Sequence, residues 1–291
     1  MNPLLKKIII CPKCNASKSL DYHNDSAACV SCSETFAISK GMLILIDSKR
    51  EDDLDDRPPK KPGTGSYWRR QNWKFNQNIA DKLSPSNIVL EVGCGRGYFK
   101  PLFGKNYIGT DITIRKEVDF VADLIDSKCI KNESIDMLVL NNVLEHVYNF
   151  KTLLINCSNI LKKSGTVIIT IPYSSVLHQT PDDYFRFSHY ALERVCNEAG
   201  LNIIEFNAVF NPFDNMSRSY RLLKNSISGG WRNRLAKLAL NISEKAYSIS
   251  KLASKNVFPI GQISVNENQD AYNGSDTYNS PIGYHIKAVK N

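Results

Sequence analysis

The residues with the clearest chemical meaning are three glycines that follow a short apolar segment. Residues 88–92 read Ile-Val-Leu-Glu-Val, which is typical of a buried parallel strand, and glycine then occurs at 93, 95 and 97. Glycine at alternate positions lets the backbone pass close beneath a bulky ligand and leaves N–H groups free to bind it. The dinucleotide fingerprint would require a third glycine at position 98, which is Tyr98. The segment predicts a strand and a ligand-binding loop, with a tight turn that holds no ligand as the alternative.

Acidic residues end the next two predicted strands. Asp111 follows the strand expected at 106–110, and Asp123 follows the one expected at 118–122. An acid at the end of the second strand can accept hydrogen bonds from both hydroxyls of a ribose. Either aspartate alone could be a helix cap or a loop acid. Their position at the ends of successive strands favours a nucleoside-containing ligand.

The glycine loop and the two acids resemble the motifs of class I S-adenosylmethionine-dependent methyltransferases, and among these the type 11-like group. The resemblance covers about residues 67–212 and 281–290. It implies S-adenosyl-L-methionine as cofactor, with Asp111 at the ribose, Asp123 at the adenine amino group and Leu124 over the ring. The cofactor-binding residues that it implies are Glu91, Gly93, Cys94, Gly95, Gly97, Asp111, Ile112, Asp123, Leu124 and Asn141.

Two histidine-containing segments are expected at the same crevice, because ligands of open α/β sheets bind beyond the carboxyl ends of the strands. His146 ends a segment that begins at Asn141, after a strand predicted at 135–140, and resembles the Leu-Glu-His segment of the family. His178 begins a segment similar to the H-x-x-P-x-D-Y-x-R-F motif of a subgroup found among polysaccharide and secondary-metabolite enzymes.

These segments supply the candidates for chemistry on the acceptor. His146, His178 and Asp183 are candidates for a base or a substrate holder, and Arg186 for binding an anionic group. The alternatives are that His146 only shapes the pocket, and that Arg186 pairs with an aspartate in a structural knot. The remaining histidines of the domain, His189 and His285, are expected on the surface.

A separate cluster of cysteines lies near the start of the chain. Two C-x₂-C knuckles, separated by fourteen residues, provide four thiolates that can close a tetrahedral zinc site. Four cysteine ligands leave no open position, so the zinc is expected to be structural. The pattern is similar to the zinc-ribbon activator subunit of eukaryotic methyltransferases and its bacterial relatives. The predicted ligands are Cys11, Cys14, Cys29 and Cys32.

Alternating strand and helix patterns predict an α/β fold that positions these residues. We expect a doubly wound, mostly parallel, seven-stranded Rossmann-like sheet behind a β-rich zinc ribbon, with a helical C-terminal insertion. Helical spacing occurs at 67–83, 150–161 and 188–199. The expected strands are 88–92, 106–110, 118–122, 135–140, 166–171, 201–206 and 281–289. The expected domains are a zinc ribbon at 1–47, a linker at 48–66 and a methyltransferase domain at 67–291.

An insertion is expected at 213–280, and residues 213–291 carry eleven basic and five acidic side chains, six of the eight excess positive charges. Residues 216–257 carry nine Lys or Arg and one acid, Glu244. Apolar residues recur at helical spacing, which predicts a helix with basic residues off its apolar face; they are Trp231, Leu235, Leu238, Ile242, Ala246, Ile249 and Ala253. The helix could cover the substrate pocket, touch an anionic membrane surface through 231–255, or hold a phosphate-bearing substrate. Residues 265–280 are expected to form a mobile loop.

The sequence therefore predicts a methyltransferase that acts on a hydroxyl of a sugar, glycan or lipid-linked small molecule. Methylation of a base in rRNA or tRNA is the alternative, because bacterial 23S rRNA guanine methyltransferases resemble this order of domains and the basic segment suits phosphate contacts. A scaffold that binds the cofactor without turnover is a further alternative. No apolar run approaches the ~18 residues of a membrane span and no signal peptide is recognised, so a cytoplasmic location is expected, with contact to the inner membrane surface as an option.

Overall fold

The structure is a computed structural model, and the parts of the chain that it describes do not include the expected linker in full. Residues 47–60 lie outside the described residues, as do 210–222, 254–260 and 263–280 around the expected insertion, including all of the expected loop at 265–280. The described residues are 1–16, 20–46, 61–126, 128–209, 223–227, 229–253, 261–262 and 281–291.

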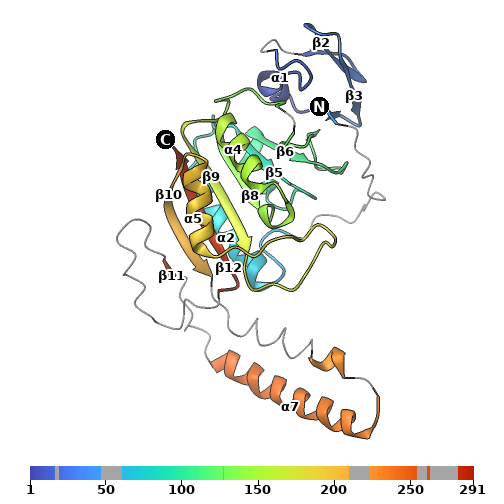
Figure 1. Cartoon of the computed structure of the whole chain (residues 1–291), viewed down its shortest axis with the longest axis vertical. Coiled ribbons are helices and arrows are strands. Elements are labelled where there is room, and N and C mark those ends of the chain that lie inside the picture. The colour runs from blue at the N-terminus through green and yellow to red at the C-terminus, as the bar shows by residue number, and fades with distance from the viewer. Residues whose placement is uncertain are drawn as a thin grey trace.

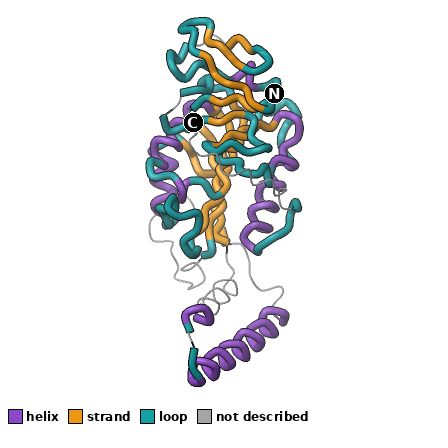
Figure 2. The backbone as a smooth tube through the Cα atoms, turned by 90° about the vertical axis from the view of Figure 1, so that its right-hand side faces the viewer, coloured by secondary structure: helices purple, strands orange, loops and turns teal. Residues whose placement is uncertain are grey.

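A single mixed sheet runs through the described part of the chain, with helices on both of its faces (Figures 1 and 2). Its order is β1-β2-β3-β4-β7-β6-β5-β8-β9-β12-β10-β11. The strands are β1 (Leu20–Tyr22), β2 (Ser26–Cys29), β3 (Thr35–Ser39), β4 (Met42–Ile44), β5 (Val89–Val92), β6 (Tyr107–Asp111), β7 (Phe120–Val121), β8 (Ile135–Asn141), β9 (Leu161–Pro172), β10 (Leu201–Val209), β11 (Gly261–Gln262) and β12 (Gly283–Lys290). The helices are α1 (Leu5–Ile8), α2 (Tyr67–Ala80), α3 (Lys100–Phe103), α4 (Phe150–Ile160), α5 (His189–Glu198) and α7 (Trp231–Ala253), with short 3₁₀ turns η1 (Gly104–Asn106) and η2 (Leu144–His146).

The prediction of an α/β fold is confirmed, but the predicted number of seven strands is not. The segments expected as strands are β7, β6, β5, β8, β9, β12 and β10, which are neighbours in this order, and the pairings from β7 to β9 are parallel. Additional strands lengthen both ends, so that twelve described strands join. The reason at one end is that β4 pairs in parallel with β7, which would otherwise be an exposed edge.

The cysteine-containing N-terminal segment packs directly on the sheet domain. Ile9 forms an antiparallel bridge with Ile130, and Leu5 and Ile8 are buried in the same apolar cluster as Leu138 in the central strand β8. Figure 1 shows the strands β2 and β3 on the side of the sheet where β6 lies, and β4 and β7 join them to β6 in the strand order. The hydrophobic core therefore extends without interruption from the cysteine cluster into the sheet.

The two faces of the sheet are covered by different helices, as the alternation of side chains along a strand requires. Leu138 and Leu140 of β8 lie in the cluster that contains residues of α4 and α5. Met137 and Val139 lie in the second cluster, with Phe75 of α2. The near-continuous apolar sequence of β8 is thus explained by burial on both faces.

The helix α7 forms at the predicted place in the insertion, but it does not cover the site. It lies apart from the sheet in Figures 1 and 2. Its apolar side chains Leu235, Leu238 and Ile242 are 57%, 55% and 61% exposed. No helix among the described residues has the length and apolarity that crossing a membrane requires.

The surface position expected for His285 is wrong, because the side chain is buried between β12 and α2. His285 is 1% exposed and stacks on Phe75 at 4.6 Å between ring centroids. Its Nε2 lies 2.8 Å from the side-chain amide of Asn72, which also is buried and donates to it when the amide is turned accordingly. Burial lowers the pKa of His285 to about 3, so the ring is neutral in the folded protein.

This burial predicts a specific acid sensitivity. Between pH 6.5 and about 3 the unfolded chain protonates His285 and the folded chain does not. Stability from this residue is therefore fully present above pH 6.5 and falls as the pH is lowered, by at most about 1.4 kcal/mol per pH unit. The variant His285→Gln, which keeps a hydrogen-bonding partner for Asn72, should flatten the pH dependence of the free energy of unfolding. Urea titrations between pH 4.5 and 7 measure it, and His23→Gln is the control. An unchanged slope in His285→Gln would contradict the assignment.

Candidate cofactor and acceptor site

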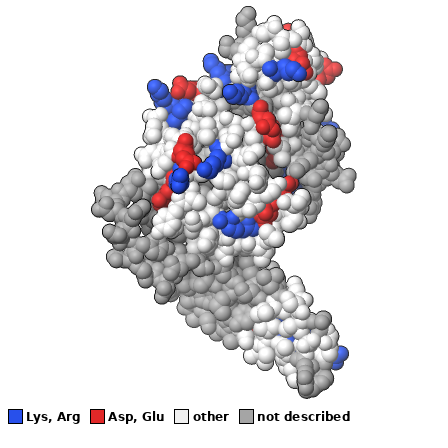
Figure 3. Space-filling model, viewed as in Figure 1, with Lys and Arg blue, Asp and Glu red and all other residues white. Residues whose placement is uncertain are grey.

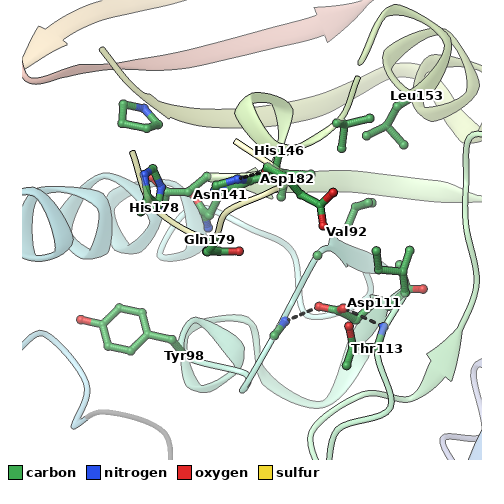
Figure 4. A pocket seen from close by; sticks show the side chains of 18 of the residues that line it. Val92, Tyr98, Asp111, Thr113, Asn141, His146, Leu153, His178, Gln179 and Asp182 are labelled. Atoms are coloured by element: carbon green, nitrogen blue, oxygen red, sulfur yellow. Dashed lines mark hydrogen bonds between the residues drawn. The ribbon is translucent and has the colours of Figure 1, made fainter. Parts of the chain in front are cut away.

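A cleft of about 1440 Å³ lies beyond the carboxyl ends of the parallel strands. Figure 4 shows Asp111 and Thr113 in one part of it, and Asn141, His146 and His178 in another. The cleft thus joins loops that follow β5, β6, β7, β8 and β9, as the topology of an open α/β sheet predicts. The predicted site residues that line it are Gly93, Gly95, Asp111, Ile112, Asp123, Leu124, Asn141, His146 and His178.

The glycine loop after β5 has three left-handed residues. The φ angles of Gly93, Gly95 and Gly97 are +69°, +53° and +66°. A Cβ at Gly93 would lie 2.8 Å from Val143, and one at Gly97 would lie 2.9 Å from Glu117, whereas one at Gly95 would meet open space. Gly93 and Gly97 are therefore required by packing, and Gly95 leaves room in the cleft itself.

Asp111 ties the end of β6 to the glycine loop. One oxygen of its carboxylate accepts a hydrogen bond from the Gly95 N–H at 2.9 Å, and the other accepts from the Thr113 N–H at 3.0 Å. Asp123 makes a local turn in the same way, because its side chain accepts from the Ile125 N–H at 2.9 Å. Each aspartate has further acceptor sites on its carboxylate, and both residues line the cleft.

Three of the predicted cofactor residues lie behind the cleft rather than in its lining. Glu91 is 2% exposed and accepts a hydrogen bond from the Tyr107 hydroxyl at 2.6 Å. Burial raises the pKa of Glu91 to about 8. Burial also raises the pKa of Cys94, whose Sγ would lie 2.8 Å from a Cβ at Gly109. These residues and Gly97 support the loop from beneath.

Asn141 is held by an amide pair that the sequence analysis did not find. Its side chain exchanges two hydrogen bonds of 3.1 Å with Asn76 of α2, and its oxygen accepts from the Thr170 hydroxyl at 3.0 Å. Asn72 and Asn76 are both buried, on the face of α2 that packs on the sheet. Asparagines four residues apart on the inner face of a helix were the available signal, since such residues need partners when buried.

The two histidines of the acceptor side lie together. Their ring centroids are 4.7 Å apart and nearly perpendicular. His146 Nδ1 lies 2.6 Å from the carbonyl oxygen of Asp182, the bond drawn beside Asn141 in Figure 4. Burial lowers the pKa of His146, which favours its neutral form.

Asp183 and Arg186 form the structural pair that the sequence analysis left as an alternative, and neither is among the residues that line the cleft. The Asp183 carboxylate accepts bidentate hydrogen bonds from Arg186 at 2.7 and 2.8 Å, and one from the His178 N–H at 2.8 Å. Arg186 also donates to the carbonyls of Ser175, Val176 and Phe185. Hydrogen bonding to Arg186 holds the pKa of Asp183 well below its usual range. The pair therefore fixes the loop that carries His178.

Glu145 is the acceptor-side residue that the sequence analysis missed. It is 0% exposed, and within the described residues neither of its carboxylate oxygens has a hydrogen-bond partner. One oxygen lies 3.7 Å from His146 Nε2, which also has no partner there. Burial raises the pKa of Glu145 to about 8. An acid within the otherwise apolar sequence Val-Leu-Glu-His-Val was the signal, because a buried acid needs a partner.

The four N-terminal cysteines converge. The Sγ atoms of Cys11 and Cys32 are 3.7 Å apart, those of Cys14 and Cys29 are 3.6 Å apart, and all four lie within 4.8 Å of one another. The Ser31 N–H points at Cys29 Sγ at 3.4 Å, and backbone hydrogen bonds lower the pKa of this thiol to about 6. Four thiolates around zinc have Sγ atoms about 3.8 Å apart, from Zn–S bonds of about 2.3 Å.

Comparison with known proteins gives the class of this domain. Residues 66–205 match a family model, Methyltransf_23, described as a methyltransferase domain. Residues 66–205 thus carry a methyltransferase domain. The match begins at the N-cap of α2 and ends within β10, so it includes every described residue that lines the cleft. No curated protein sequence matches the chain.

Solved structures with a similar arrangement are distant from this methyltransferase domain in sequence. A phosphoethanolamine N-methyltransferase of Haemonchus contortus is 15% identical, with 75% of this chain and 52% of that chain covered and a TM-score of 0.43. The methyltransferase of a complex with the Trm112 activator of Haloferax volcanii is 14% identical, with 75% and 90% covered and a TM-score of 0.43. Likenesses at this level carry no argument about the substrate.

The pair of Asp183 and Arg186 should matter for stability. Replacing Asp183 by Asn removes one of the two charge-assisted hydrogen bonds to Arg186. It also removes the negative charge that compensates the guanidinium. Together these losses should lower the free energy of unfolding by about 2 kcal/mol. The matched control is Glu198→Gln in the exposed pair of Arg194 and Glu198, where we expect a much smaller loss because solvent screens the two charges. Urea denaturation at pH 7 measures both, and equal losses would contradict a structural role for Asp183.

Proposed function

We propose that this protein is an S-adenosyl-L-methionine-dependent methyltransferase that methylates a hydroxyl of a sugar, glycan or lipid-linked small molecule. The observation that carries the cofactor assignment is the cleft in which Gly95, Asp111 and Asp123 come together from three successive loops. The family match of residues 66–205 supports the reaction class. The acceptor is inferred from the other end of the same cleft.

The cofactor end offers groups that suit a nucleoside. The carboxylates of Asp111 and Asp123 can accept hydrogen bonds from hydroxyl and amino groups. Ile112, which follows Asp111 and lines the same cleft, is a large apolar side chain that is 42% exposed and that a flat ring would cover. Open space above Gly95 leaves room for the methionine part. The backbone N–H groups of the loop and Asn141 would complete the site.

The acceptor end combines aromatic and polar side chains. Tyr148 and Tyr184 are 70% and 43% exposed, line the cleft, and have ring centroids 5.6 Å apart. Gln179, next to His178, also lines it. Exposed aromatic faces beside hydrogen-bonding groups suit the apolar faces and hydroxyls of a sugar ring.

The chemistry divides between the cofactor and the protein. The bound sulfonium would supply the methyl group, and the protein's part is to align the acceptor oxygen with it and to remove its proton. We place this oxygen at His146 and His178, and the proton passes to this pair of imidazoles or to a group that they hold. Asp183 and Arg186 act as positioning residues for His178.

Methylation of RNA has weaker support from the described surface. In Figure 3 the basic and acidic side chains of the methyltransferase domain are interspersed on the visible face. RNA binding requires a basic tract that follows the phosphates. The basic helix α7 offers one, but it contributes no residue to the cleft among those described.

Cofactor binding and turnover test the function. Gly95→Ala fills the open space of the loop, and Gly200→Ala is the matched control, because its φ of +71° and its free surroundings are similar but it lies outside the cleft lining. Both variants should lose similar stability, of about 1 kcal/mol. Only Gly95→Ala should weaken binding of S-adenosylhomocysteine, by tenfold or more, measured by calorimetry.

Wild-type protein should release S-adenosylhomocysteine with a mixture of sugar and glycolipid acceptors but not with RNA. Failure of the wild type to bind S-adenosylhomocysteine would contradict the proposal.

We also propose a structural zinc ion on Cys11, Cys14, Cys29 and Cys32. Their Sγ spacing fits a tetrahedral cation, as described above. Because β4 follows the second knuckle and pairs with β7, the ion would hold the segment that covers this edge of the sheet.

Metal analysis tests the zinc site. Purified protein should contain one zinc ion bound to these cysteines, and Cys14→Ser, at an exposed position, should lose it and lower the thermal midpoint. Cys196→Ala in α5 is the control and should retain the zinc. A folded wild type without stoichiometric zinc would contradict the assignment.

A further inference from the structure

A second group of metal-ligand side chains lies at the acceptor end of the cleft. Glu145, His146 and His178 each offer one ligand atom, and these atoms lie within 4.8 Å of one another. We propose that the three side chains bind one divalent cation of the Mn²⁺–Fe²⁺–Zn²⁺ series, whose open coordination positions take the oxygen of the methyl acceptor. The role of the acceptor rests on the proposed function, whereas the cation site itself does not.

Unpartnered atoms are the first reason. Glu145 is completely buried, yet within the described structure its Oε1 and Oε2 and the Nε2 of His146 have no hydrogen-bond partner. Buried polar atoms almost always have a partner, and those that do not require an explanation such as an ion. Oε1 of Glu145 and Nε2 of His146 are 3.7 Å apart. This is the arrangement of two ligands that face a common point.

The protonation of the histidines is the second reason. His146 Nδ1 lies 2.6 Å from the Asp182 carbonyl, which can only accept, so Nδ1 carries the proton and Nε2 keeps its lone pair. His178 Nδ1 lies 3.1 Å from the Val176 carbonyl and 3.3 Å from an Asp183 oxygen, both closer than the Arg186 Nη2 at 3.5 Å. Metal-binding histidines typically donate their second ring N–H to a carbonyl or carboxylate in this way.

Charge is the third reason. Arg186 is the cation nearest to this group by its contacts, and its guanidinium already forms a bidentate pair with Asp183. Glu145 therefore has no side chain of opposite charge paired with it among the described residues. A divalent cation would bind its carboxylate in place of a proton. Two imidazole nitrogens and one carboxylate oxygen suit Mn²⁺, Fe²⁺ or Zn²⁺ better than Mg²⁺ or Ca²⁺, which prefer oxygen ligands only.

The site can also take part in the reaction. Two ligands of one tetrahedral cation are about 3.4 Å apart, so the ring of His178, which is 34% exposed, would close toward the other two ligands. Three protein ligands leave positions for a substrate oxygen. The hydroxyl held there would lose its proton more readily, and with the cation bound the proton would pass to water and not to His146 or His178, whose lone pairs would hold the cation. Its oxygen then forms the new bond to the methyl carbon, and the C–S bond of the sulfonium breaks with its electron pair remaining on sulfur.

Manganese binding tests the proposal on the full chain with zinc in its ribbon. We expect one Mn²⁺ to bind per chain, seen as loss of the free Mn²⁺ signal in electron paramagnetic resonance. Glu145→Gln, which keeps the shape of the side chain, and His178→Ala should each weaken binding at least tenfold. His23→Gln, which removes an exposed histidine of the ribbon, should leave it unchanged. Circular dichroism and S-adenosylhomocysteine binding of the same samples confirm that each variant is folded.

The outcomes separate this inference from the proposed function. Absence of saturable Mn²⁺ binding, or binding unaffected in both variants, would show that Glu145 pairs with a proton or water instead, and overturns the cation site. If Mn²⁺ binds but S-adenosylhomocysteine does not, the proposed function fails and the cation site stands. Where both bind, Mn²⁺ should raise the rate of methyl transfer at least tenfold over chelated protein, and an equal rate overturns the role of the cation at the acceptor.

Discussion

The whole site depends on the parallel pairing of β5 with β6 on one side and with β8 on the other. Val92 pairs with Thr110, and Glu91 pairs with Val139, so that the three strands end at one edge of the sheet. After β5 the chain first forms β6 on one side of it and later forms β8 on the other side. This change of direction opens a crevice at the carboxyl ends of the strands. A shift of one residue in either pairing would turn Asp111 or Asn141 to the other face. Register is therefore the constraint that brings the loops together.

Hydrophobic burial fixes this register more strongly than the polar contacts do. The strand β8 is buried on both faces, with alternate residues in two different apolar clusters. The polar contacts at the end of β8 then fix the position of its last residue. Asn141 is paired with Asn76 and Thr170, which links the end of β8 to α2 and β9. Because these partners are all buried, the amide network specifies one geometry and an incomplete network would be costly.

The N-terminal ribbon covers an edge of the sheet that would otherwise be exposed. β7 has only two residues and would be an edge strand with open N–H and C=O groups. β4 covers it by two parallel pairs, and Leu43 is buried at that junction. The ribbon itself has too little apolar surface to be stable alone, so its cysteine cluster and its contact with the sheet support each other. The order of the two parts along the chain thus has a structural reason that is independent of any activity.

Sequence patterns predicted the elements well, because apolar periodicity and glycine depend on local geometry. The ranges of α2, α4, α5 and α7 differ from expectation by at most a few residues. Patterns failed where a residue's partner is distant in sequence. His285 and Asn72 are 213 residues apart, and neither sequence neighbourhood indicates that the other exists. The ribbon was expected to be β-rich, but its joining to the sheet was not predicted for the same reason, because β4 looks complete within the ribbon and its partner β7 is distant in sequence.

At the acceptor end of the cleft, too, the sequence did not reveal contacts between residues that are distant along the chain. Asp183 and Arg186 are three residues apart, and the pairing between them was foreseeable as an alternative to a catalytic role. Glu145 and His178 are far apart in sequence, and only the fold reveals that a fully buried carboxylate faces two imidazoles. A carboxylate in that position lowers stability unless something compensates its charge. A chain that keeps such an acid in an apolar loop gains nothing in folding from it. In the proposed cation site this acid would be one of three ligands, and the loop fixed by Asp183 and Arg186 holds His178, the third, beside it.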